Sequence, residues 1–97
     1  MAQHIWLRIV SSNDGKVKTS QINFADIYNV ICNEQEYKLA QIDPYKDTFL
    51  GFHDTCDLVR EIEILEKKYP EIKELFLDTK SFFKEVTPGD ILCFIGD

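Results

Sequence analysis

The stretch HIWLRIVSSNDGKVKTSQI, residues 4–22, decides the fold of this chain. In residues 4–10, strongly apolar side chains recur at every second position, which is the period of a strand with one buried face; they are Ile5, Leu7 and Ile9. Asp14-Gly15 is a common signal for a hairpin turn. Residues 17–22 are polar, as suits a return strand at the edge of a sheet. The stretch therefore predicts an antiparallel hairpin whose first strand faces a core.

The rest of the chain alternates between helical and extended patterns. Asn23 resembles an N-cap, and apolar side chains at helical spacing follow it. The Asp-Pro pair at 43–44 predicts a turn between two strands, and a run of apolar residues near the end predicts an interior strand buried on both faces, next to the first strand. The predicted helices span 24–33, 54 or 55 to 69, and 70–86, and the remaining predicted strands span 36–42, 48–52 and 91–96.

These elements predict an α+β fold of the order β-β-α-β-β-α-α-β. Hairpins favour a mostly antiparallel sheet of about five strands, with three helices on one face in a two-layer arrangement. A length of 97 residues with 44% hydrophobic side chains suits one domain, 1–97, with one core.

The charge of the chain points to a protein partner. It has 17 acidic and 11 basic residues and a net charge of −6. Binding to phosphates requires clustered Lys and Arg, which no stretch supplies, so we expect no direct contact with nucleic acid. A basic protein is the natural electrostatic complement.

The cysteines and the hydropathy indicate the compartment. Cys32, Cys56 and Cys93 are far apart and odd in number, which argues against a disulfide framework and for a reducing environment. The N-terminus lacks a signal-peptide pattern, and no stretch is apolar enough to span a bilayer. We expect a cytoplasmic protein without membrane contact.

Metal binding and catalysis have weak support in the sequence. His53 and Cys56 have the H-x-x-C spacing of one ligand pair, but a structural zinc site needs a second pair. No glycine-rich elbow surrounds Cys56 to support a nucleophile paired with His53 or His4. Asp43, Asp47 and His53 form the hydrolytic alternative, although aspartates around a proline turn are usually turn caps. We expect no metal, no cofactor and no enzymatic activity.

A binding surface has better support. Tyr45 lies between Asp43 and Asp47, and Asp54, Asp57 and Glu61 follow near the start of the next helix. Tyrosine is enriched among interface hot spots, and carboxylates form charge-assisted bonds to Arg and Lys. An ordinary solvated helix face is the alternative for the helix acids. Ile64 and Leu77 lie off the apolar stripes of their helices, so each is a single exposed side chain or part of a binding patch.

Two elements of the sequence resemble a group of small bacterial proteins. The element IDPYKDT, residues 42–48, and the ending FIGD, residues 94–97, resemble an Ile-Asp-Pro-Tyr-x-Asp-Thr element and a terminal Phe-x-Gly-Asp in that group. Small acidic α+β proteins of this kind are similar to the immunity proteins of toxin systems, including contact-dependent growth inhibition.

The resemblance implies a non-enzymatic protein that neutralises one cognate toxin domain, often a nuclease, in the cytoplasm. A nuclease presents a basic cleft built for phosphates, which carboxylates on a rigid scaffold can occupy. The alternative is a small intracellular adaptor or regulatory subunit whose protein partner is not a toxin.

Overall fold

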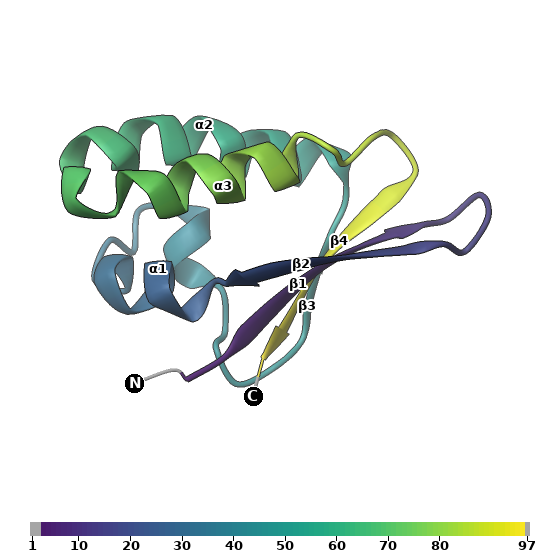
Figure 1. Ribbon diagram of the computed structural model, residues 1–97, viewed down its shortest axis with the longest axis horizontal. Helices are drawn as coiled ribbons and strands as arrows, with labels where there is room; N and C mark the ends of the chain where they lie inside the picture. The colour runs from purple at the N-terminus through teal and green to yellow at the C-terminus, as the bar shows by residue number, and fades with distance from the viewer. Residues whose placement is uncertain (1–2, 97) are drawn as a thin grey trace.

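The computed structural model describes residues 3–96, which form a four-stranded sheet with helices on one of its faces (Figure 1). The predicted α+β class and the three helices are confirmed. No helix of the described residues is long and apolar enough to cross a membrane. In chain order the elements are β1 (Ile5–Ser11), β2 (Val17–Asn23), α1 (Ala25–Ile31), the 3₁₀ helix η1 (Lys38–Gln41), β3 (Thr48–Leu50), α2 (Phe52–Lys68), the 3₁₀ helix η2 (Pro70–Ile72), α3 (Lys73–Phe83) and β4 (Asp90–Gly96).

The strands are arranged in the order β2-β1-β4-β3, and each neighbouring pair is antiparallel. The last strand therefore lies beside the first, and the polar strand β2 forms an edge, as predicted. The β1–β2 turn contains Gly15 at φ 71°, a left-handed conformation that suits glycine. Gly89, at φ 93°, allows the turn in which the N–H of Asp90 donates to the carbonyl of Thr87 at 2.9 Å.

The predicted strand 36–42 is wrong, which is why the sheet has four strands instead of five. Residues Lys38–Gln41 form η1, in which Leu39 and Ala40 are buried. The carboxylate of Glu61 in α2 accepts the N–H groups of Lys38 and Leu39 at 2.9 and 2.8 Å. A short apolar run has an ambiguous period, and this contact from a distant helix favours the helical form.

Because residues 36–42 do not form a strand, the partner of β3 and the role of the Asp-Pro turn differ from those predicted. β3 pairs with β4, so residues 43–47 connect η1 to β3 and do not close a hairpin. Several boundaries also differ: α2 begins at Phe52, before the predicted 54 or 55, and α1 is shorter than 24–33. α3 and β3 are shorter than the predicted 70–86 and 48–52, because residues 70–72 form η2 and β3 ends at Leu50. β4 is interior, but its second face is only partly buried, because Ile91 is exposed.

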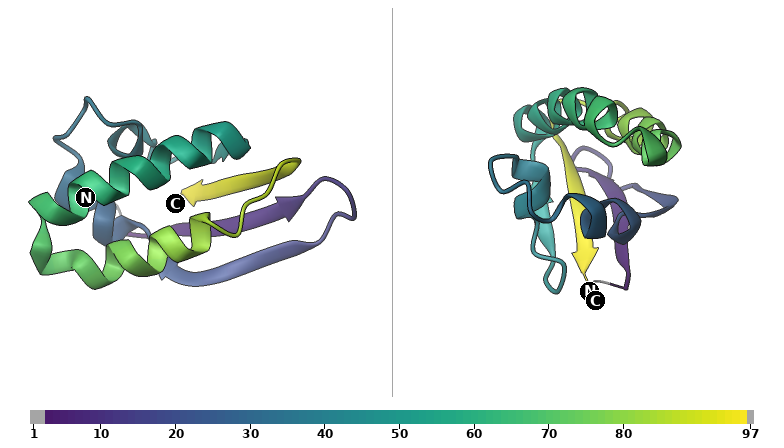
Figure 2. Two further views of the ribbon diagram at one scale, coloured as in Figure 1. Left: turned by 90° about the horizontal axis from the view of Figure 1, so that it is seen from above. Right: turned by 90° about the vertical axis from the view of Figure 1, so that its left-hand side faces the viewer.

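The core lies between the helices and the face of the sheet that carries Ile5, Leu7 and Ile9. Phe94 of β4 is fully buried at its centre, with ring centroids 5.1 Å from Phe24 and 5.8 Å from Phe83 in edge-to-face geometry. Figure 2 shows α2 and α3 side by side over this layer. The predicted helix stripes are confirmed by the buried side chains Leu58, Ile62 and Leu65 of α2 and Phe76, Thr79, Phe82 and Phe83 of α3.

A buried carboxylate joins the segment after α1 to the end of α2. Glu34 is 7% exposed, and its side chain accepts hydrogen bonds from Lys68 Nζ, at 2.9 Å, and from the hydroxyl of Tyr69. These two bonds, the one from Lys68 first, hold the pKa of Glu34 below its usual value. Ionised Glu34 therefore stabilises the folded state.

We expect Glu34→Gln to change how stability depends on pH. A carboxyl whose pKa is lowered by folding stabilises the protein above its unfolded pKa, near 4.5, and this contribution is lost as pH falls through the folded pKa. Urea unfolding should show the largest difference from the natural chain above about pH 5, and this difference should shrink as pH falls below the unfolded pKa. Lys68→Met removes one of the two donors to Glu34, so it should also reduce the loss of stability at low pH. Parallel pH profiles for the natural chain and Glu34→Gln would contradict the role of this ion pair.

Candidate protein-binding site

The loop 43–47 has a defined turn geometry. The side chain of Asp43 accepts the N–H of Tyr45 at 2.9 Å, and its carbonyl accepts the N–H of Lys46 at 3.5 Å. An aspartate that bonds the backbone two residues later is an Asx-turn. The predicted turn role of Asp43 is thus present, although the turn leads from a 3₁₀ helix into β3.

The same loop lies directly against the end of β4. A Cβ atom added at Gly96 would be 2.7 Å from the backbone N and O of Lys46 and from the carbonyl O of Pro44. Only glycine permits so close an approach of two backbones. The two elements on which the resemblance rests therefore contact each other in the fold, through Gly96 and residues 44–46; Asp97, the last residue of the second element, lies outside the described residues.

Tyr45 projects from this braced loop and is 61% exposed. Asp43 and Asp47 on either side of it are exposed, and neither forms an ion pair with another described residue. Burial raises the pKa of Tyr28 in α1, and the nearby Cys32, Tyr45 and Asp43 raise it further. The loop thus lies near α1 and offers one aromatic ring between two unpaired carboxylates.

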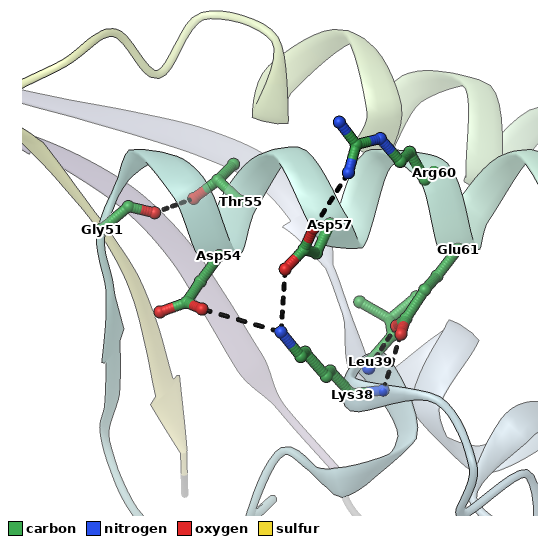
Figure 3. A network of polar contacts seen from close by, with 8 residues as sticks. All are labelled: Lys38, Leu39, Gly51, Asp54, Thr55, Asp57, Arg60 and Glu61. Atoms are coloured by element: carbon green, nitrogen blue, oxygen red, sulfur yellow. Dashed lines mark hydrogen bonds and ion pairs between the residues drawn. The ribbon is translucent and has the colours of Figure 1, made fainter.

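The helix acids of the predicted surface are, in contrast, already paired (Figure 3). Lys38 Nζ lies 2.8 Å from a carboxylate oxygen of Asp57 and 3.8 Å from one of Asp54. Arg60 lies 3.1 Å from the other oxygen of Asp57. The hydrogen bond to Lys38 is the main reason why the pKa of Asp57 is lowered and that of Lys38 is raised.

Glu61 has a structural role at the start of η1. Its two carboxylate oxygens accept the N–H groups of Lys38 and Leu39, which are unpaired at the start of a helix. Of the six predicted contact residues, the loop set Asp43, Tyr45 and Asp47 forms no ion pair with a described residue, although one oxygen of Asp43 accepts the N–H of Tyr45. The helix set Asp54, Asp57 and Glu61 is engaged by Lys38, Leu39 and Arg60.

The residues of the hydrolytic alternative do not form a joined cluster. His53 is exposed in the first turn of α2 and lies against Phe52, with ring centroids 5.7 Å apart. Among the residues that the structure describes, no hydrogen bond or ion pair connects His53 to Asp43 or Asp47. Within residues 3–96, no three His, Cys, Asp or Glu side chains are placed to hold a metal ion together.

The sequence interpretation missed one apolar surface. Trp6 of β1 and Phe49 of β3 are 41% and 61% exposed on the face of the sheet opposite the helices. The signal was available, because Trp6 and Val10, which alternate with the core residues of 4–10, are also apolar, whereas His4 and Arg8 are not. Of the two residues off the helix stripes, Ile64 is 54% exposed and Leu77 is half-buried.

Known proteins add no information on this surface. Comparisons of the chain with known protein families, with curated proteins and with solved structures found no match. The function of the loop 43–47 is therefore argued from its geometry, exposure and charge, and the resemblance to immunity proteins stays a prediction.

Gly96→Ala tests whether the loop is braced by β4. The new methyl group would overlap the backbone of Lys46 and Pro44, and such overpacking costs roughly 1 to 3 kcal/mol. Gly51→Ala is the control, because a Cβ there has nothing within 4 Å and the φ of −83° is allowed for alanine; since Gly51 is the N-cap of α2, a loss of only about 0.5 kcal/mol is expected. Urea unfolding should show a clear loss for the first variant and little change for the second. Equal stability of the two variants would show that the loop moves away without penalty.

Glu61→Ala tests the cap on η1. Loss of both acceptors leaves two backbone N–H groups without partners, which should lower the free energy of unfolding by roughly 1 to 3 kcal/mol. Glu63→Ala, at an exposed position two residues on, should change it by about 0.5 kcal/mol or less. Unfolding by urea provides the comparison, and an equal effect of both variants would remove the capping role.

Proposed function

We propose that this chain is an immunity protein that binds and neutralises a cognate toxin domain, a basic nuclease. The observation that carries the proposal is Tyr45, 61% exposed between two carboxylates that form no ion pair with a described residue. A hydrophobic ring so exposed contributes little to the fold. Its position suits an anchor for a partner that supplies cations around an apolar pocket.

Bracing of the loop supports high affinity. A flexible loop loses conformational entropy when it binds, and this loss reduces the net binding energy. Here the Asx-turn of Asp43 and the contact of Gly96 with the backbone of Pro44 and Lys46 hold the loop before any partner arrives. Preorganisation of this kind favours a tight inhibitor over a transient contact.

The charge of the molecule supports a basic partner. The net charge of −6 attracts a basic domain over long range and speeds encounter. At short range, Asp43 and Asp47 are available for charge-assisted hydrogen bonds to Arg or Lys of the partner. The acids at the start of α2 contribute mainly to the long-range negative potential of the chain, because Lys38 and Arg60 already neutralise part of their charge.

The proposal predicts a salt-dependent association with the toxin domain encoded beside this chain's gene. Association rates measured by stopped flow should fall at least about tenfold between low and high salt, because screening weakens steering. Tyr45→Ala should weaken the affinity by roughly 30-fold, mainly through faster dissociation. Glu63→Ala is the control, because it removes one exposed side chain away from the loop. It should bind like the natural chain.

Co-expression separates this function from its alternatives. The natural chain should protect cells from the toxin domain, and Tyr45→Ala should protect them less. Binding without protection would favour the adaptor or regulatory subunit. Turnover of a substrate that is abolished by Asp47→Asn or His53→Ala would favour the hydrolytic alternative, and an association rate independent of salt would contradict electrostatic recognition.

A further inference from the structure

The face of the sheet opposite the helices, called the outer face here, is largely apolar, with Arg8 of β1 and Thr19 of β2 as its polar strand residues. Side chains alternate along a strand, so the residues between the core positions of β1 and β4 point to this face. Figure 1 and Figure 2 show all three α-helices on the other side. The outer face consists of Val17 and Thr19 from β2, Trp6, Arg8 and Val10 from β1, Ile91, Cys93 and Ile95 from β4, and Phe49 from β3.

These side chains form one continuous patch. The register pairs Arg8 with Cys93 and Cys93 with Phe49 in a row across the sheet. The neighbouring rows pair Trp6 with Ile95, and Val17 with Val10 and Ile91. Four of the six large exposed hydrophobic residues in the described part of the chain belong to this patch, namely Trp6, Val17, Phe49 and Ile91. Contiguous exposed apolar surface of this kind marks an interaction site.

The patch carries one charge of each sign. Arg8 is exposed in its middle row. Asp47 is two residues before Phe49 on the same extended segment and is exposed, so alternation places it on the same side. Both charges lie near the buried Cys93: burial raises the pKa of this thiol, Arg8 lowers it and Asp47 raises it. The outer face is therefore neutral, although the whole chain carries a net charge of −6.

This charge pattern favours a second copy of the chain as the occupant. A basic partner would meet Arg8 at the centre of the apolar surface, and an acidic partner would meet Asp47 and the negative field of the chain. In a two-fold dimer the same patch meets itself. Arg8 of one copy can then approach Asp47 of the other, while apolar rows cover each other.

The size of the face sets the expected strength of the contact. Strands about 4.8 Å apart and up to seven residues long give a face of roughly 20 Å on each side. Two sheets pack about 10 Å apart, with side chains between them. Two such faces give a contact of about 800 Å² in total, below the standard size of specific interfaces. We therefore expect a weak dimer that forms only at micromolar concentrations or above.

We propose that two copies of this chain associate through the outer faces of their sheets, with Arg8 of each copy paired with Asp47 of the other. The helices then lie on the outside of a four-layer dimer. This association is a property of the chain alone and does not require the proposed toxin partner.

Sedimentation velocity from about 1 to about 300 µM tests the dimer on the purified full chain. The natural chain should pass from monomer to dimer over this range. Phe49→Asp should remain a monomer, because it places a charge in the apolar contact. Ile64→Asp is the matched control, since Ile64 is 54% exposed on α2, away from the sheet, and it should dimerise like the natural chain. Circular dichroism of each variant checks that the fold is kept.

Charge exchange tests the pairing of Arg8 with Asp47. Arg8→Glu and Asp47→Arg should each raise the dissociation constant of the dimer at least about tenfold, and the double variant should restore it. Tyr45→Ala, which tests toxin binding, should leave the dimer unchanged, so the two proposals fail independently. A natural chain that stays monomeric throughout, or a dimer disrupted by Ile64→Asp but not by Phe49→Asp, would overturn the dimer. A dimer that the double variant does not restore would overturn the pairing.

Discussion

Insertion of the last strand into the middle of the sheet is the constraint on which the rest of the structure depends. β4 lies between β1 and β3, so without it the short strand β3 would have no partner and only the β1–β2 hairpin would remain of the sheet. Its inner side supplies Phe94, against which Phe24 and Phe83 pack. Its end supplies Gly96, which contacts the loop 43–47. One strand thus joins the N-terminal hairpin, the helix layer and the candidate binding loop.

Polar contacts fix the segments that the sheet does not reach. η1 has no strand partner, and its backbone is held by Glu61 while the Lys38 side chain pairs with Asp57. Glu34 fastens the preceding segment to the end of α2 through Lys68 and Tyr69. Glu61, Asp57 and Glu34 therefore stabilise the fold and also contribute to the negative charge of the molecule. A surplus of carboxylates does not by itself make a recognition surface, because part of it is used internally.

Two surfaces that share Asp47 remain available to partners. The loop with Tyr45 is small, acidic and rigid, which suits a protein partner that presents cations. The outer face of the sheet is broad, apolar and neutral, which suits a copy of itself. Asp47 lies at the border of both surfaces, since it precedes β3 and follows the turn. A partner that binds Asp47 on one surface therefore removes its charge from the other surface.

Much of the fold follows from local sequence. The alternation of residues 4–10, the Asp14-Gly15 turn and the helix stripes around Leu58 and Phe76 each depend on neighbours in the chain, so the hairpin, the helices and the buried side of β1 were predictable. The strand predicted at 36–42 failed because a carboxylate from a distant helix caps it as a 3₁₀ helix.

The features of the candidate site likewise fall into those that could be predicted from the sequence and those that could not. The order of residues alone places Tyr45 between two acids and makes the chain acidic. Three features arise only when the chain folds: the acids of α2 pair with Lys38 and Arg60, Gly96 contacts the loop, and Trp6 and Phe49 share an exposed face. The physical reason is that pairing, close approach and exposure depend on residues far apart in sequence, whose meeting is set by the packing of helices and strands.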